Sequence, residues 1–336
     1  MIVLGIETSC DDTGIGIYNF KTHKVLSHVL SSQHEIHKKF LGVVPEYAAR
    51  AHLEVIDVLF DYALKEANLR PKDIDLICVT NRPGLIGSLF VGLMFAKGLC
   101  LALEKPLKAV DHLEAHIFSP FIGFKKEDIP FPFLSIVVSG GHTHFYLVED
   151  IGKYTLVAKT LDDALGEAFD KVGSHILGLG FPGGPYIDKI FQSYKGEYIS
   201  FTYPKVKKNP FNLSFSGFKT QAIKYHNQGA DKMKLAASFQ KYTIDYLISK
   251  IEKILKHYKI NALAISGGVS ANSYFRKKIL NLKDVKVYMP DLKYTSDNGV
   301  MVAYIGGFLF EKYGEDPIDI NAYSYSPLQQ FNQIYN

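Results

Sequence analysis

The same order of elements occurs twice along the chain. Residues 2–7 read as a buried strand, residues 8–14 as a turn rich in Ser, Thr, Asp and Gly, and two further strands lead to a helix at 45–68. The order begins again at 133–138, where a strand runs into the turn 139–143, two more strands and a helical pattern. A duplicated α/β unit is the economical explanation. We therefore expect an α/β fold with two similar domains and a cleft between them.

The domain limits follow from this repeat and from composition. A stretch with Gly, Pro and charged residues before residue 130 reads as a linker, so we expect one domain at 1–125 and a second at 130–297. The last helix, about 298–325, is expected to pack back on the first domain. Residues 196–216 combine prolines, lysines and aromatic residues and are predicted to be an exposed insertion, either a contact for nucleic-acid phosphates or a solvated loop. The lysines in and beside it are Lys195, Lys205, Lys207 and Lys208.

Composition limits the cellular setting. Three widely separated cysteines without a CxxC pair make a disulfide framework or a cysteine zinc site improbable and favour a reducing cytoplasm. No secretory signal is expected, since the chain opens directly on a strand. Residues 85–103 are long and apolar enough to span a bilayer, but a buried helix packed on a sheet is the preferred interpretation, so no membrane is expected. His34 and His37, beside lysines, are expected to be solvated, and Cys10 is interpreted as a small residue.

Two histidines four residues apart, His112 and His116, lie where the pattern predicts the start of a helix. Positions i and i+4 share one helix face, so both imidazoles can reach one divalent cation; a pair of ordinary histidines is the alternative. In zinc peptidases of the His-Glu-x-x-His type a glutamate follows the first histidine, whereas here Leu113 holds that position and Glu114 points away. The spacing therefore indicates a metal site without the general base of a peptidase.

Asp297 lies in Ser-Asp-Asn-Gly, directly before the last helical pattern. Taken alone, this position is typical of a helix N-cap. With His112 and His116, Asp297 would instead complete a set of two histidines and one carboxylate, which suits iron(II) and tolerates zinc.

Small polar turns follow three predicted strands, at 8–13, 139–143 and 266–272. Backbone N–H groups in such turns suit phosphate groups. Neither the GxxxxGK[ST] nor the GxGxxG pattern occurs in the sequence, which disfavours the P-loop and dinucleotide-binding folds. His142, beside the second turn, is a better candidate for the cleft than His144, which alternates with it along a strand.

Eight short segments occur in one order and with compatible gaps between about residues 1 and 310. They are Gly5-Ile6-Glu7-Thr8-Ser9-Cys10-Asp11, His112-x-x-x-His116, Ser139-Gly140-Gly141-His142-Thr143, Gly166-Glu167-Ala168-Phe169-Asp170-Lys171, Phe181-Pro182-Gly183-Gly184-Pro185, Ser214-Phe215-Ser216-Gly217, Ser266-Gly267-Gly268-Val269-Ser270-Ala271-Asn272 and Thr295-Ser296-Asp297-Asn298-Gly299. This set resembles the TsaD family, bacterial tRNA N6-adenosine threonylcarbamoyltransferases once called Gcp or O-sialoglycoprotein endopeptidases. The chain departs from the family at Asp12, often glutamate, at Arg82, usually glycine, and at His144, commonly glutamine.

The resemblance implies a duplicated actin/Hsp70/sugar-kinase (ASKHA) fold made of two RNase H-like domains. It implies transfer of threonylcarbamoyl from threonylcarbamoyl-AMP to N6 of adenosine 37 in tRNAs reading codons that begin with A, with TsaB-like and TsaE-like protein partners. It implies one divalent metal ion, Fe(2+) before Zn(2+), held by His112, His116 and Asp297. The implied substrate-binding residues are Val137, Val138, Ser139, Gly140, Gly141, Asp170, Gly184, Asp188 and Asn272.

Three other functions compete with this one. A kinase or ATPase of the same fold would transfer the γ-phosphate of ATP, and would leave the two histidines and Asp297 without a purpose. A metallopeptidase lacks its general base beside His112, and an inert scaffold would not need the intact turn motifs. For acyl transfer, Asp11 or Asp12 is the candidate acceptor of the amine proton.

Overall fold

The computed structural model describes residues 1–207 and 209–330. Its contacts divide the chain into two compact units. The first unit comprises Met1–Pro130, Asp150–Tyr154 and the chain from Pro290 onward, and the second comprises Phe131–Glu149 and Thr155–Met289. The domain limits expected from the sequence stay a prediction, as does the cleft.

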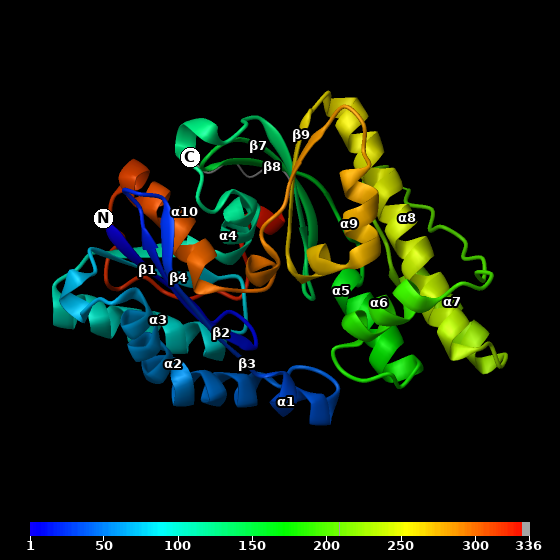
Figure 1. Ribbon diagram of the computed structural model, residues 1–336, viewed down its shortest axis with the longest axis horizontal. Helices are drawn as coiled ribbons and strands as arrows, with labels where there is room; N and C mark the ends of the chain where they lie inside the picture. Colours follow the sequence, from blue (N-terminus) through cyan, green and yellow to red (C-terminus); the bar gives the residue numbers. More distant parts are fainter. Residues whose placement is uncertain (208, 331–336) are drawn as a thin grey trace. The chain divides into compact units, whose positions relative to one another are not determined.

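The first unit is built on a five-stranded sheet in the order β3-β2-β1-β4-β5 (Figure 1). Strand β1 pairs antiparallel with β2 and parallel with β4, and β5 extends the parallel side. The central strand is buried on both faces, which explains why it reads as a nearly continuous apolar run. The strands are β1 (Ile2–Glu7), β2 (Asp12–Asn19), β3 (Lys24–Ser32), β4 (Leu76–Arg82) and β5 (Leu107–Asp111).

Helices cover both faces of this sheet. Leu4 and Ile6 of β1 join a core cluster with the buried sides of α2 and α3, whereas Gly5, which points to the opposite face, lies against α10. The helix α10 packs on β1 and β2 through glycines on both elements, so its backbone comes unusually close to the strands. The helices of this unit are α1 (His34–His37), α2 (Pro45–Ala67), α3 (Ile86–Leu103), α4 (His112–Phe118) and α10 (Gly299–Tyr313).

The second unit repeats this arrangement. Its sheet has the order β10-β9-β6-β7-β8, with β6 antiparallel to β7 and parallel to β9, and β10 parallel to β9. The pairing around β6 thus matches the pairing around β1, which confirms the predicted duplication. The strands are β6 (Phe133–Val138), β7 (Thr143–Asp150), β8 (Lys153–Lys159), β9 (Ala262–Ser266) and β10 (Lys286–Tyr288). The helices are α5 (Leu165–Asp170), a π-helix at Lys171–Ile176, α6 (Gly183–Ser193), α7 (Ser216–Asn227), α8 (Lys232–Tyr258) and α9 (Ser273–Leu280).

Exposure differs from the prediction in part of the segment 196–216 and at His37. The segment 196–216 is only partly exposed, because Phe201, Leu213 and Phe215 are buried in the core of the second unit. Apolar side chains alternate with the lysines in this segment and anchor it to the core, while Lys205 and Lys207 face solvent. Lys208 lies outside the described residues. His37 is fully buried, and both ring nitrogens have hydrogen-bond partners there. Its Nε2 bonds the side-chain oxygen of Gln33, and its Nδ1 accepts from the backbone N–H of Val44.

The long apolar helix α3 meets the length and composition of a membrane span, a test that core helices of soluble proteins also pass. One face of α3 packs on α2 and β4 through residues such as Leu89 and Leu93. The other face leaves Phe90, Met94 and Leu101 exposed. The predicted burial is therefore right for one face of α3 and wrong for the other.

Candidate metal centre and substrate residues

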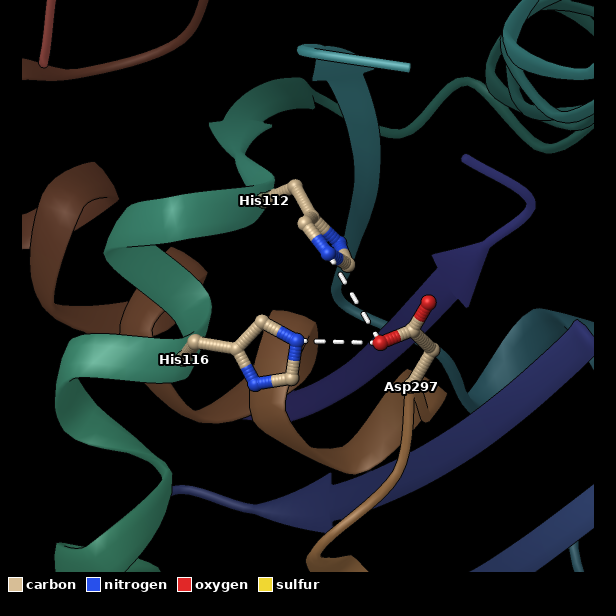
Figure 2. A group of neighbouring side chains, drawn as sticks. All are labelled: His112, His116 and Asp297. Atoms are coloured by element: carbon tan, nitrogen blue, oxygen red, sulfur yellow. Dashed lines mark hydrogen bonds and ion pairs between the residues drawn. The ribbon is translucent and has the colours of Figure 1, made fainter. Parts of the chain in front are cut away.

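Three side chains of the first unit converge on one point (Figure 2). Nε2 of His116 lies 2.9 Å from Oδ1 of Asp297, and Nε2 of His112 lies 3.6 Å from the same oxygen. The three potential ligand atoms all lie within 4.8 Å of one another. His116 is fully buried and His112 nearly so, whereas the Asp297 side chain is 22% exposed to solvent. The set is thus enclosed on the histidine side and open at the carboxylate.

The local sequence explains the histidine pair. Asp111 caps α4 by accepting from the N–H of Leu113 at 2.9 Å, and the hydroxyl of Ser326 donates to the same carboxylate. The cap fixes His112 as the first helical residue and places His116 one turn later on the same face. Glu114 points elsewhere, since its carboxylate accepts from the Tyr154 hydroxyl at 2.5 Å. No peptidase-type glutamate therefore faces the pair from this position of α4.

Asp297 is brought to the pair by the start of α10. The capping residue of α10 is Asn298, whose side chain accepts from the N–H of Met301 at 2.9 Å. The alternative role of Asp297 as a helix cap is therefore excluded, and its carboxylate faces the histidines. The following residue, Gly299, lies directly against the β2 backbone, which fixes where the chain enters the helix.

The chemistry of these atoms fits a divalent cation. Two imidazole nitrogens and one carboxylate oxygen approach each other as metal ligands do. Two histidines and one carboxylate suit iron(II) and also zinc, and leave coordination positions for further ligands.

Electrostatics distinguish the two histidines. Burial disfavours a charged His112, but the carboxylates of Asp297 and Glu7 outweigh this and raise its pKa to about 9. Burial and the neighbouring charge of His112 lower the pKa of His116. Without a bound cation, a protonated His112 therefore supplies one positive charge next to the carboxylates of Asp297 and Glu7. A bound cation would take the place of that positive charge.

Glu7 was not singled out from the sequence, although it lies in this centre. Its carboxylate is fully buried at the end of β1, and its Oε2 lies 3.0 Å from Nδ1 of His112. A charged residue that ends an otherwise apolar central strand is the signal that could have indicated it.

Asp12 opens β2, and its Oδ1 is buried without a hydrogen-bond partner in the described part of the chain. Burial, together with the negative charges of Asp297 and Asp11, raises the pKa of Asp12 to about 8. Such a group is well matched to accept a proton near neutral pH. The backbone carbonyl of Asp11 is engaged with the N–H of Gln33.

The predicted substrate residues all belong to the second unit. Val137 and Val138 end β6, and the turn after it is closed by the Ser139 N–H, which donates to the His142 carbonyl at 2.8 Å. Gly140 and Gly141 at the tip are exposed, and a Cβ atom on either glycine would meet nothing within 4 Å. The turn therefore presents free space beside its backbone. His144 is buried, and burial lowers its pKa to about 3.

The remaining predicted residues form two hydrogen-bonded groups. The N–H of Gly184 donates to the Asp170 carboxylate at 3.2 Å. Asp188 and Asn272 are joined through Gln240, which donates to Asp188 at 2.7 Å and accepts from the Asn272 amide at 2.9 Å. Gln240 is fully buried within α8 and was missed because its neighbours in sequence follow an ordinary amphipathic pattern.

Solved structures similar to this chain share its fold. HypF from T. kodakarensis matches with a TM-score of 0.63 and 14% identity, over 93% of this chain and 48% of that one. Component A of the Acidaminococcus fermentans (R)-2-hydroxyglutaryl-CoA dehydratase matches with a TM-score of 0.56 and 14% identity, over 93% and 98% of the two chains. Together with the duplicated sheets, these matches confirm the ASKHA fold.

Curated relatives are much more similar in sequence. A protein of Dictyoglomus turgidum is 47% identical over 93% of this chain and 94% of its own length, and one of Brachyspira hyodysenteriae is 46% identical over 100% and 98%. Both are named tRNA N6-adenosine threonylcarbamoyltransferase. The sequence profile of the family described as "TsaD: tRNA N6-adenosine threonylcarbamoyltransferase" matches residues 24–304. The chain therefore belongs to the TsaD family of tRNA N6-adenosine threonylcarbamoyltransferases.

Proposed function

We propose that this chain transfers threonylcarbamoyl from threonylcarbamoyl-AMP to N6 of adenosine 37 in tRNAs reading codons that begin with A. The observation that carries the proposal is the convergence of His112, His116 and Asp297 in a chain of this family. A kinase or ATPase has no use for such a set of ligands.

In the proposed reaction the exocyclic amine of adenosine attacks the carbamoyl carbon of the mixed anhydride. The new C–N bond forms as the C–O bond to AMP breaks, and the amine proton passes to a base. His112, His116 and Asp297 would hold Fe(2+), with Zn(2+) as the alternative. When bound, the cation supplies a Lewis acid that polarises a donor oxygen. Asp12 is the stronger candidate for the base, because its Oδ1 is unpartnered and the pKa is about 8; Asp11 remains the second candidate.

We assign the donor to the second unit. The exposed turn at Ser139, Gly140 and Gly141, after Val137 and Val138, offers backbone N–H groups of the kind that bind phosphate. The carboxylates of Asp170 and Asp188 suit ribose hydroxyls, with Gly184 and Asn272 beside them. The fixed hydrogen bonds of these groups support a preorganised site.

The partners proposed are tRNA and two proteins, one TsaB-like and one TsaE-like. Lys205 and Lys207 are exposed and can contact tRNA phosphates. The helices α2 and α3 leave large apolar side chains in solvent, among them Leu53, Tyr62 and Leu101. Exposed apolar side chains of this kind support a contact with another protein. Three free cysteines support a cytoplasmic location.

The test is transfer of labelled threonylcarbamoyl from its AMP ester to tRNA, with both partner proteins present. His116→Ala is expected to abolish transfer while remaining folded. His37→Ala, which removes another buried histidine of the same unit, is the matched control and is expected to retain transfer. Equal transfer by wild type and His116→Ala would remove the metal ligands from the mechanism. ATP turnover without transfer by wild type would favour the kinase or ATPase.

A further inference from the structure

Glu7 contributes a buried carboxylate to the wall of the metal centre, behind His112. Its two oxygens have different partners. Oε1 accepts from the backbone N–H of Ser9 at 2.6 Å, and Oε2 accepts from the Thr80 hydroxyl at 2.6 Å and lies 3.0 Å from Nδ1 of His112. An ionised carboxylate only accepts hydrogen bonds, so Nδ1 of His112 must be the donor in this contact.

The other nitrogen of His112 faces the proposed cation site. Nε2 lies 3.6 Å from Oδ1 of Asp297, on the side where the ligand atoms converge. A neutral imidazole carries one proton, and only the nitrogen without it can bind a metal ion. A proton fixed on Nδ1 therefore leaves the Nε2 lone pair directed at the site.

His116 differs in this respect. Its Nδ1 is buried without a hydrogen-bond partner in the described part of the chain, and its Nε2 contacts Asp297. No contact described behind His116 holds a proton on its Nδ1, and without a cation its Nε2–H donates to Asp297. Glu7 thus holds the proton of His112 on Nδ1, whereas no such partner holds a proton on Nδ1 of His116.

We propose that Glu7 is a positioning residue that imposes the Nδ1–H tautomer on His112 and so makes its Nε2 available to the cation. This inference rests on the proposed metal-dependent function and adds a residue that does not touch the cation. Such partners of metal-binding histidines orient the ring and raise its basicity.

The unequal partners of the two Glu7 oxygens give Glu7→Gln a specific outcome. If the new NH2 group replaced Oε1, it would face the Ser9 N–H, a backbone donor that cannot reverse. If it replaced Oε2, it would donate to Thr80, whose hydroxyl can rotate, and to Nδ1 of His112. The second orientation is the satisfiable one, and it moves the His112 proton to Nε2. A substitution of nearly equal shape is therefore expected to block the nitrogen that binds the metal ion.

The tautomer can be measured without any metal ion. Long-range ¹H–¹⁵N correlation spectra of the metal-free protein, recorded at alkaline pH where the imidazole signals no longer change with pH, report which nitrogen carries the proton. We expect Nδ1–H in wild type and Nε2–H in Glu7→Gln, with His112→Asn used to assign the signal. Thr80→Val removes one donor from Glu7 without adding any, and is expected to retain Nδ1–H.

Cobalt(II) titration, followed by its visible absorption, then measures the consequence for binding. We expect Glu7→Gln to weaken cobalt binding by roughly 10- to 100-fold. Glu114→Gln, which alters another buried carboxylate near the same histidines, is the matched control and is expected to bind as wild type does. Because losing a negative charge alone weakens cation binding, the tautomer is the deciding measurement.

A wild-type spectrum with the proton on Nε2 of His112 would overturn the proposal even if Glu7→Gln did not fold. Retention of Nδ1–H and of full cobalt affinity in Glu7→Gln would overturn it as well. If wild type bound no cobalt but showed the Nδ1–H tautomer that Glu7→Gln reverses, the proposed metal centre would fail while the role of Glu7 in setting the tautomer would stand.

Discussion

The close approach of α10 to β2 leads to a prediction for Gly16→Ala. A Cβ atom on Gly16 would lie 2.3 Å from the backbone nitrogen of Val300 and 2.5 Å from the carbonyl carbon of Gly299. Both are backbone atoms of the first turn of α10, so no side-chain rotation can relieve the contact. Ordinary contacts of this kind begin at 3.4 Å, so the helix start must move away by more than one ångström.

That movement has two expected effects. Forcing an extra methyl group into a packed interface costs about 1–3 kcal/mol of unfolding free energy, occasionally more. Asp297 lies two residues before Gly299, so a displaced helix start also moves its carboxylate away from His116. Metal–ligand distances tolerate only about 0.2 Å, so cobalt binding should be lost even where the protein remains folded.

Chemical denaturation and cobalt titration measure the two effects. Gly42→Ala and Gly98→Ala are controls in the same unit, since a Cβ atom at either position meets nothing within 4 Å. Gly42→Ala should leave the free energy of unfolding within about 0.5 kcal/mol of wild type. Gly98→Ala, inside α3, should increase the free energy of unfolding by at most about 1 kcal/mol. If Gly16→Ala matched Gly42→Ala in stability and bound cobalt as wild type does, the reasoning from close packing would be refuted.

Three further predictions concern single side chains. Gln240→Leu should raise the KM for the threonylcarbamoyl donor about tenfold, equivalent to about 1.4 kcal/mol, because Asp188 loses one of its hydrogen-bond donors; an unchanged KM would contradict this. Asp12→Asn should slow transfer about a hundredfold or more and abolish the rise in rate toward pH 8 that is expected for wild type. Burial opposes ionisation of Asp163, but two lysines outweigh it and lower its pKa. The resulting stability is present above the unfolded pKa of about 3.9 and is lost as pH falls below it; Asp163→Asn should therefore lose about 1 kcal/mol at pH 7 and show less acid destabilisation in urea titrations.

The fold was predictable because its signal is periodic and local. Strands such as 2–7 and 133–138 are short apolar runs followed by small polar turns, and their repetition indicated two similar sheets. Exposure was harder to predict for 196–216 and for His37, since burial there depends on distant partners. Phe201 joins a core formed by residues far along the chain, which no local pattern reveals.

In the candidate site, too, features set by local sequence were predictable and contacts between distant residues were not. His112 and His116 were found because their spacing is a property of one helix. The sequence left two roles open for Asp297, metal ligand and helix cap. The structure excludes the second, because Asn298 caps the helix. Glu7 and Gln240 were missed because each acts through a contact with a residue that is remote in sequence, at 105 and 52 positions respectively.

The separation of the metal ligands along the chain bears on how the protein is made. His116 and Asp297 are 181 residues apart, and the whole of the second unit is encoded between them. During synthesis both histidines leave the ribosome long before Asp297 and α10 do. The sheet of the first unit can pair its strands early, but one of its faces must wait for α10. The cation site is therefore completed only after the second unit has been translated, and a nascent chain stalled before Asp297 would carry a histidine pair that lacks its carboxylate.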